Sequence, residues 1–502
     1  MRVEIRLFDF VWALLIVYLF VFQIATIWPF TIDDMYIPLR YAKHWVSGEG
    51  LLWNIGEPPV EGYTSFGFLV LAAAFLKMGL NPVIMFKVAG VLGLVLTAIG
   101  LTLMSRLWFN WRLSFIPLLW LLWYRGQIVW SVSGLETSVY EALMIWAVFF
   151  AFRALGYRFY PLERRDPRII YYLLSGLMLA FAALTRPETP AFVLMFFFLF
   201  YIDGLKKYWR GLKFFTAIFL CFYLPYFLWH YYYFTRLFPN SIYCKGLTGH
   251  SWGVLTANYL KLTWPFLLLS LPAIQKAKDF RYLFLLLPSI IYMFLLLGAD
   301  PIVAFYNRLF LPAFALLLPL SLLGLSHLMG NFFTEKNKLY QLLMYVVSLT
   351  FAIVFIPGMT LNNYQSFTEN PIKGEQLRQE LVDWLKNHVD TDKTIVLSDS
   401  GYIPFYSPHS FIDSYCLNNL RMTQYSGQMY QQFCKDIFQQ KPEVIILTSL
   451  VEPDKITYTP ADLCLHRQLK NTANYQKKKV FKTKTEAPYY RYELFKLSRN
   501  AE

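Results

Sequence analysis

The sequence is poor in charged residues and in cysteine. Of its 502 residues, 16% are charged and 57% are hydrophobic. This balance excludes an ordinary soluble protein, because a chain of this size could not bury so much apolar surface. The five cysteines include no CxxC pair, so the sequence carries no metal-site or redox motif. Cys416, Cys434 and Cys464 can form a disulfide if they are exported, but we expect them to be inert.

Long apolar segments recur over the first 357 positions. Segments of about 20 apolar residues can cross a membrane as helices, and Tyr and Trp crowd their ends as in an interfacial belt. The predicted fold class is a polytopic α-helical membrane protein. We expect eleven spans, at 7–30, 82–104, 113–131, 136–153, 169–185, 188–203, 214–234, 254–272, 282–298, 308–328 and 340–357. Arg2 and Arg6 precede the first span without a clear cleavage site, which indicates a retained anchor and not a signal peptide.

The net charge of +14 lies in short loops between these segments, a distribution that argues against nucleic acid as a partner. If segment 63–78 lies in the outer interface and does not cross, the basic loops all fall on one side. That side is cytoplasmic by the positive-inside rule, so the N-terminus is inside and the C-terminus outside. These basic residues are Arg2, Arg6, Arg106, Arg112, Arg153, Arg164, Arg165, Arg168, Lys206, Lys207, Arg210, Lys213, Lys276, Lys278, Arg281, Lys336 and Lys338.

Residues 358–502 are mostly polar and predict a soluble α/β domain. Apolar residues at helical spacing predict a helix over 374–389, and another helix fits 423–440. Short strands are expected at 394–398, 410–414 and 443–448, with a hairpin at the end. We therefore expect two domains, a membrane domain over 1–357 and an outer domain over 358–502. The membrane domain would include a first outer loop at 31–81 with its interfacial helix.

An acidic pair, Asp33 and Asp34, directly follows the first apolar segment. Two adjacent carboxylates at a span end are costly to desolvate and resist joint ionisation. One reading is structural: Asp34 caps a helix, and Arg40 or Lys43 neutralises the pair one turn later. The other reading is chemical: one carboxylate is a general base, and its neighbour orients the acceptor hydroxyl or holds a cation.

Further polar groups fall on the outer face in this topology, in loops 31–62, 131–137, 186–188, 235–253 and 298–308. Such convergence is what an active site requires. Arg186, Lys245 and Arg308 each fit a topology anchor, but together they offer cations for a lipid phosphate. Glu136 and Glu188 are costly near a membrane unless paired, so Arg186 and Glu188 can equally neutralise each other.

Six ordered blocks carry a family resemblance. They are DDMYIPLRYAKHWVSGEGLLWNIGEPPVEGYTSF (33–66), SGLET (133–137), TRPE (185–188), FPNSIYCK (238–245), NRLFLP (307–312) and SDSGYIPFYS…FIDSYCLNN (398–419). Together they resemble bacterial GT-C membrane glycosyltransferases, and the nearest pattern is the mycobacterial terminal arabinofuranosyltransferase group. The chain also looks like the LphB-type surface-glycan proteins of Legionella. One departure is Thr189, which follows TRPE where glycine is expected.

The resemblance implies an inverting transferase that uses a polyprenyl-phosphate sugar at the periplasmic face of the bacterial inner membrane. It implies Asp33 as the catalytic base, with Asp34 beside it. The polar motif positions expected to bind donor phosphate or substrate are Arg40, His44, Glu61, Tyr63, Ser133, Glu136, Arg186, Glu188, Asn240, Lys245 and Arg308. A divalent cation at Asp33 and Asp34 is compatible with the family, and no other cofactor is expected.

The sequence therefore favours transfer of one sugar from a polyprenyl-phosphate donor to a hydroxyl of a glycan acceptor, such as lipopolysaccharide. Two other functions stay open at this point. A lipid-linked glycan transporter or flippase would use the acidic pair as an ion site, although the charges lie at one face and no inverted repeat is visible. A non-catalytic envelope-assembly protein would use the C-terminal domain as a binding module.

Overall fold

The computed structural model describes residues 7–160, 166–202, 205–246, 252–277, 280–299, 301–332, 338–424, 429–483 and 488–498. Within these ranges the chain divides into two compact units. Unit 1 comprises 1–28, 86–229 and 248–365, and unit 2 comprises 29–85, 230–247 and 366–502. The first loop and the C-terminal segment, far apart in sequence, thus belong to one unit. Of the basic loop residues, Arg2, Arg6, Arg164, Arg165, Lys278 and Lys336 lie outside the described residues.

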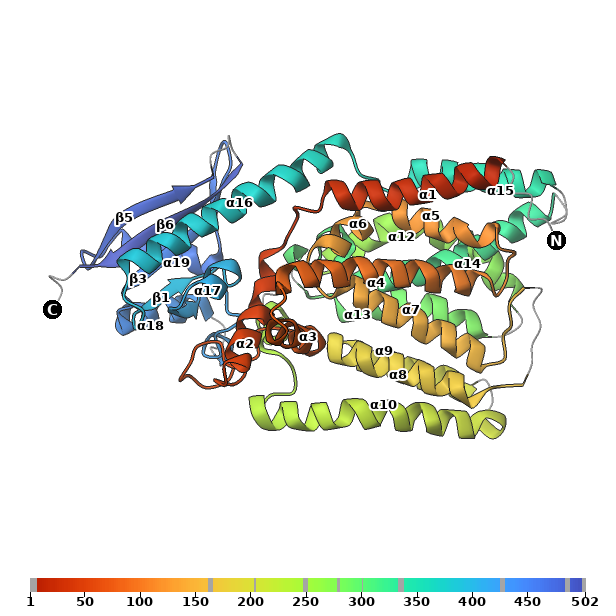
Figure 1. Cartoon of the computed structure of the whole chain (residues 1–502), viewed down its shortest axis with the longest axis horizontal. Coiled ribbons are helices and arrows are strands. Elements are labelled where there is room, and N and C mark those ends of the chain that lie inside the picture. Colours follow the sequence, from red (N-terminus) through yellow and green to blue (C-terminus); the bar gives the residue numbers. More distant parts are fainter. Residues whose placement is uncertain are drawn as a thin grey trace. The chain divides into compact units, whose positions relative to one another are not determined.

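Unit 1 is a bundle of apolar helices (Figure 1). Its helices are α1 (Leu7–Thr26), α4 (Pro82–Ser105), α5 (Ile116–Trp123), α6 (Arg125–Val132), α7 (Thr137–Ala154), α8 (Ile169–Thr185), α9 (Thr189–Ile202), α10 (Leu205–Phe234), α12 (Val254–Lys276), α13 (Leu283–Leu295), α14 (Leu311–Gly330) and α15 (Lys338–Phe355). Five helical segments in the described residues are long and apolar enough to cross a membrane, and seven shorter apolar helices accompany them. This is the helix content of a membrane protein.

The predicted span 113–131 is not one helix. A short 3₁₀ turn (Leu113–Phe115) leads into α5, which stops at Tyr124, where the backbone is extended, and α6 starts at Arg125. The break is held because the Arg125 N–H donates to the Pro357 carbonyl and the Tyr124 hydroxyl donates to the Tyr306 carbonyl. The polar sequence after Tyr124 thus ends the helix by bonding to other segments of unit 1.

Helix α14 forms the centre of unit 1, and 89% of its apolar window is buried. It packs closely on α12, because Gly324 has no side chain: a Cβ there would lie 1.7 Å from the Leu269 carbonyl oxygen. Small residues allow such close approach between apolar helices. Ser270 and Ser321 hydrogen-bond across the same contact at 3.1 Å.

Unit 2 joins a few short helices to a mixed sheet. From the first loop come the 3₁₀ turn η1 (Asp33–Met35), α2 (Tyr36–Val46) and α3 (Phe66–Lys77), and α11 (Asn240–Gly246) follows α10. The C-terminal part holds α16 (Leu361–His388), β1 (Thr394–Leu397), α17 (Tyr402–Tyr406), β2 (Ser410–Asp413), the 3₁₀ turn η5 (Met422–Gln424), α18 (Met429–Gln440), β3 (Val444–Val451), β4 (Ile456–Tyr458), α19 (Pro460–Leu469), β5 (Tyr475–Lys482) and β6 (Tyr489–Leu497).

The strand order is β2-β1-β3-β6-β5, with β4 paired to β3. Strand β1 runs parallel to β2 and β3, whereas β3, β6 and β5 are antiparallel neighbours. The central strand β3 is buried from Val444 to Leu447, and α16 covers the sheet with Leu377, Leu381 and Leu385 buried. The predicted helices, strands and final hairpin are present, although α16 starts earlier than expected. Strand β4 and helix α19 were not predicted.

Two disulfides lie in unit 2. Cys434 pairs with Cys464, and Cys416 pairs with Cys244, so the expectation of an inert role is wrong for Cys416, Cys434 and Cys464. The pairing joins α11 to the segment after β2, which are 172 residues apart in sequence. Cys221 is free.

Candidate active site

Asp33, in η1 at the start of the first loop, is held by the C-terminal segment of unit 2. Its Oδ1 lies 3.2 Å from Nε of Arg378 on α16 and accepts a hydrogen bond of 2.9 Å from the Tyr402 backbone N–H. The Asp33 side chain is only 14% exposed. A carboxylate this enclosed keeps a fixed direction, which a group that acts on a substrate needs.

Arg378 also binds a second carboxylate. Its Nε donates to Oδ2 of Asp399 at 3.1 Å, and the Tyr492 hydroxyl donates to the same oxygen. The carboxyl groups of Asp33 and Asp399 also hydrogen-bond to each other. Gly401 permits this approach, because a Cβ there would lie 2.1 Å from the Asp33 carbonyl oxygen and 2.2 Å from Oδ2. One guanidinium thus bridges two carboxylates from distant segments.

The two carboxylates differ in proton affinity. Burial, and then the Asp399 carboxylate, raise the pKa of Asp33 well above its ordinary value, and Arg378 opposes the shift only in part. Burial alone would also raise the pKa of Asp399, but Arg378 and hydrogen bonds from Asp33 and Tyr492 hold that pKa below its ordinary value. Two carboxyl groups this close are more stable when they hold one proton between them than when both are ionised. Asp33 is therefore the member of the pair that takes up a proton.

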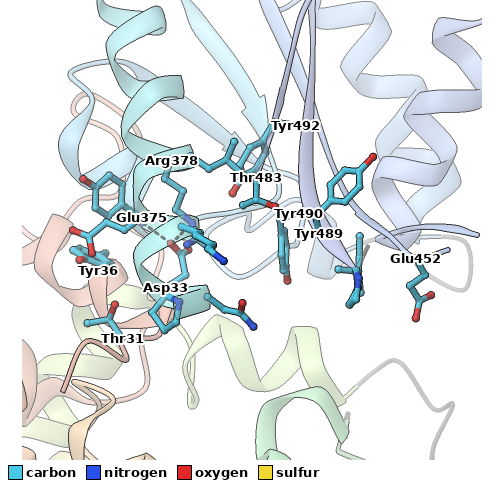
Figure 2. Close-up of a pocket in the computed structure, with 18 residues that line it drawn as sticks. Thr31, Asp33, Tyr36, Glu375, Arg378, Glu452, Thr483, Tyr489, Tyr490 and Tyr492 are labelled. Atoms are coloured by element: carbon cyan, nitrogen blue, oxygen red, sulfur yellow. Dashed lines mark hydrogen bonds and ion pairs between the residues drawn. The ribbon is translucent and has the colours of Figure 1, made fainter. Parts of the chain in front are cut away.

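A cavity of about 340 Å³ opens beside Asp33 (Figure 2). All of its walls belong to unit 2: the first loop, α16, the end of β3 and the β5–β6 hairpin. The lining residues are Thr31, Asp33, Tyr36, Asn370, Pro371, Lys373, Gly374, Glu375, Leu377, Arg378, Tyr402, Leu450, Glu452, Thr483, Pro488, Tyr489, Tyr490 and Tyr492. Figure 2 shows Arg378 reaching from α16 toward Asp33, with Tyr490 nearby. The cavity is thus aromatic and polar, with a carboxylate in its wall.

The neighbouring Asp34 is half-buried and is not among these lining residues. The structure thus separates two carboxylates that the sequence could not distinguish. Among the described residues, no three His, Cys, Asp or Glu side chains gather as metal ligands. At Asp33, the positive charge facing the carboxylate is the guanidinium of Arg378. The residues present do not fit a divalent cation.

A second polar cluster lies in unit 1, where α7, α8 and α14 meet. Glu136 Oε1 accepts from Nη1 of Arg186 at 2.8 Å and from Nη2 of Arg308 at 2.9 Å. Arg186 also donates through Nε to Glu188 at 2.7 Å, and Arg308 donates through Nε to Thr137 at 3.0 Å. Two arginines and two glutamates therefore neutralise each other. Such pairing is what buried charges require.

Local structure explains how this cluster forms. Gly134 has φ +83°, a conformation that favours glycine, and it turns the chain between α6 and α7. Ser133 closes the same turn by donating to the Trp130 carbonyl at 2.9 Å and accepting from the Leu135 N–H. The SGLET block is thus a turn that delivers Glu136 to the start of α7.

The chain is similar to one family model and to several solved structures. A family model described as "Domain of unknown function (DUF8728)" matches residues 363–495. No curated protein matches the sequence. Among solved structures, ArnT from Cupriavidus metallidurans bound to undecaprenyl phosphate matches with a TM-score of 0.59 and 14% identity, covering 96% of this chain and 98% of its own.

Two further structures match. The archaeal oligosaccharyltransferase AglB from Archaeoglobus fulgidus, in complex with an inhibitory peptide and a dolichol-phosphate, has a TM-score of 0.51 and 11% identity over 91% of this chain and 75% of its own. A cryo-EM structure of arabinofuranosyltransferase AftD from Mycobacteria has a TM-score of 0.51 and 11% identity over 96% of this chain and 41% of its own.

This chain has the GT-C glycosyltransferase fold. The prediction of a GT-C fold from the ordered motifs is confirmed. In this fold the first loop, which carries Asp33, packs with the C-terminal segment in unit 2.

Several predicted site residues have structural contacts that account for them. Arg40 is buried, stacks on the Trp53 ring at 4.8 Å and donates to the carbonyls of Trp53, Pro404 and His409. His44 bonds through Nδ1 to the Leu52 carbonyl at 2.8 Å. The Arg40 bonds to Pro404 and His409 hold the first loop to the C-terminal segment, whereas the His44 bond lies within the first loop. We therefore leave Arg40 and His44 out of the proposed catalytic group.

Glu61 forms a buried pair with Nε2 of His230 at 2.6 Å. Burial raises the pKa of Glu61, and the hydrogen bond from His230 opposes the shift. The buried Tyr63 ring packs edge-on against Tyr41 at 5.0 Å. These contacts shape the inner part of the first loop.

Asn240, at the start of α11, donates to the carbonyls of Cys416 and Leu417 at 2.9 and 3.0 Å. The FPNSIYCK block thereby fastens α11 to the C-terminal segment, together with the Cys244–Cys416 disulfide. Lys245 lies within α11, but its side chain falls outside the described residues.

The sequence prediction missed two polar residues that contact Asp33, namely Asp399 and Arg378, whereas Arg125 stood out as an arginine inside a predicted span. Asp399 lies in the sequence block 398–407. Its neighbours Ser398 and Gly401 indicated that this acidic residue lies in a loop. Arg378 gave no signal, because an arginine on an amphipathic helix is ordinarily a solvated residue. Arg125, at the break between α5 and α6, places its guanidinium 4.6 Å from the Tyr306 ring centre, and its buried Nε has no hydrogen-bond partner among the described residues.

Proposed function

We propose that this protein is a membrane glycosyltransferase. It moves one sugar from a polyprenyl-phosphate carrier to a hydroxyl of a cell-surface glycan at the periplasmic face of the bacterial inner membrane. The observation that carries the proposal is the enclosed carboxylate of Asp33 in the wall of a polar, aromatic cavity. The GT-C fold supports it, as do the lipid phosphates bound by two proteins of similar fold, ArnT and AglB.

In the proposed reaction, Asp33 accepts the proton of the acceptor hydroxyl as its oxygen attacks the anomeric carbon of the donor. The bond from that carbon to the phosphate oxygen breaks, and the polyprenyl phosphate leaves with the electron pair. Attack opposite the leaving group inverts the configuration at the anomeric carbon. Asp34 does not line the cavity, so we assign the base role to Asp33 alone.

For the donor, we propose that the polar ends of α6, α7, α8 and α14 contact the lipid phosphate. Arg186 and Arg308 are already paired with glutamates, so they act as one neutral cluster that fixes these ends. Arg125 is the further cation, because its stacked guanidinium has an unsatisfied donor. Fixed cations stabilise a departing phosphate without reorganising. The two disulfides of unit 2 support a periplasmic location, because disulfides persist in oxidising compartments.

The test is a transfer assay with purified protein in proteoliposomes. The donors are a panel of undecaprenyl-phosphate sugars with a radiolabel in the sugar, and the acceptor is a membrane glycolipid extract from cells that lack the protein. We expect label from one donor to enter the glycolipid with release of undecaprenyl phosphate. If no donor is consumed, the proposal fails. If the labelled lipid crosses the bilayer without acceptor, a flippase is the correct function.

The raised pKa of Asp33 predicts an unusual pH dependence. A base works only when deprotonated, so transfer is lost as pH falls through the raised pKa, above the ordinary aspartate value of about 3.9. Asp399→Asn removes the adjacent negative charge, and Arg378 then pairs with Asp33 alone. Both changes lower the pKa of Asp33, so the acid limb of the kcat/KM profile should move to lower pH. The other titratable groups in the described lining of the cavity are Tyr36, Lys373, Glu375, Tyr402, Glu452, Tyr489, Tyr490 and Tyr492.

The measurement is kcat/KM for the labelled donor across pH in wild type and in Asp399→Asn. The control is Asp392→Asn, which changes an acid that is 71% exposed. A purely structural role for Asp399 would lower the rate at all pH values without moving the limb, and that result would refute the electrostatic account.

A further inference from the structure

We infer that the cavity beside Asp33 binds the acceptor glycan, as a neutral saccharide end stacked on Tyr490. The inference rests on the proposed function and adds the acceptor site to it. The cavity volume of about 340 Å³ is near the lower end of ligand sites, about 300–1,000 Å³, so it suits a short saccharide end and not a long lipid.

The charges in the walls argue against the donor phosphate as the occupant. The lining holds two cations, Lys373 and Arg378, and three carboxyl groups, Asp33, Glu375 and Glu452, so the described lining carries no excess positive charge whether or not Asp33 holds a proton. Both cations are already paired: Arg378 with Asp33 and Asp399, and Lys373 with Glu369 at 3.1 Å. A wall whose described cations are already paired offers no free positive charge to a phosphate. A neutral, hydroxyl-rich ligand has no such cost.

The aromatic wall supplies the recognition surface. Tyr490 and Tyr492 lie two residues apart on β6 and therefore share one face of the strand. The Tyr492 ring is buried and its hydroxyl bonds Asp399, whereas Tyr490 leaves 48% of its surface exposed in the cavity wall. An exposed ring in a concave wall offers an apolar face with a polar edge, which suits the C–H face and hydroxyls of a sugar. Figure 2 shows Tyr490 next to the Asp33–Arg378 pair.

Asp33 and Tyr490 line the same cavity. A saccharide on Tyr490 places its hydroxyls toward the wall that contains Asp33, the proposed base. The C-terminal segment then selects the acceptor, since α16 and the β5–β6 hairpin form most of the lining. This cavity selects a ligand with hydroxyl groups, because an analogue without them would leave the polar groups of the wall without hydrogen-bond partners.

The test separates acceptor from donor kinetics. In the transfer assay, Tyr490→Ala should raise the amount of glycolipid extract needed for half-maximal rate by roughly tenfold, as loss of an aromatic stacking surface predicts. The half-saturating donor concentration should stay unchanged. Tyr490→Phe keeps the ring and should remain within about twofold of wild type. The matched control is Val480→Ala, an exposed residue of the neighbouring strand β5 that does not line the cavity.

The outcomes are distinct. If wild type consumes no donor, the proposed function fails. If wild type transfers sugar and Tyr490→Ala needs the same amount of extract, or needs more donor instead, the acceptor site is refuted while the function stands. A labelling measurement guards against misfolding: in a Cys221→Ser background, Tyr490→Cys should react with maleimide more slowly in the presence of extract. Protection by donor lipid alone would overturn the inference.

Discussion

Asp33→Asn is expected to lower sugar transfer by about 10²–10⁴-fold, the range by which general base catalysis accelerates reactions. Asparagine has nearly the same shape and can still accept the Tyr402 N–H bond, but it cannot take the acceptor's proton. The substitution also removes one of the two carboxylates that Arg378 bridges. Loss of catalysis with retained fold is therefore the expected result.

The measurement is initial rate in the transfer assay, with thermal unfolding in detergent as the check on folding. Asp392→Asn changes an acid that is 71% exposed and should leave the rate unchanged. Asp34→Asn tests the neighbour separately, and its rate should fall far less than that of Asp33→Asn, because Asp34 does not line the cavity. Near wild-type turnover in Asp33→Asn would refute the base assignment.

Glu136→Gln is expected to destabilise unit 1 by about 3–5 kcal/mol, the usual cost of breaking a buried ion pair by removing one partner. Glu136 is 5% exposed and accepts hydrogen bonds from both Arg186 and Arg308. After the change, Arg186 keeps its pair with Glu188, and Arg308 loses its ion pair with Glu136. An uncompensated charge in a water-poor site is the reason for the cost.

The measurement is thermal unfolding of the purified protein in detergent, with Glu380→Gln, an exposed glutamate of α16, as the control. The double variant Glu136→Gln/Arg308→Gln separates charge from packing. If unbalanced charge is the cause, the double variant costs less than the sum of the two single variants. Additive losses would contradict the charge explanation, and an unchanged melting temperature would remove the structural role.

Much of the fold was predictable because its signals are local. Apolar segments predicted the helices of unit 1, and periodicity in the C-terminal segment predicted α16, α18, β1, β2 and β3. The break at Tyr124 was not predictable, because its stabilising partners, the Pro357 and Tyr306 carbonyls, lie about 180–230 residues away in sequence. The disulfide partner of Cys416 was missed for the same reason, since Cys244 precedes it by 172 residues.

By itself, the sequence determined the class of the protein and the carboxylates to consider. Long apolar segments indicate membrane helices, because a helix satisfies its backbone hydrogen bonds within the segment, and the acidic pair stands out against them. Tertiary structure alone decided that Asp33, and not Asp34, meets Arg378 and Asp399 in the wall of a cavity. The physical reason is that the proton affinity of a carboxylate depends on burial and neighbouring charge, and folding brings those neighbours from 345 and 366 residues farther along the chain.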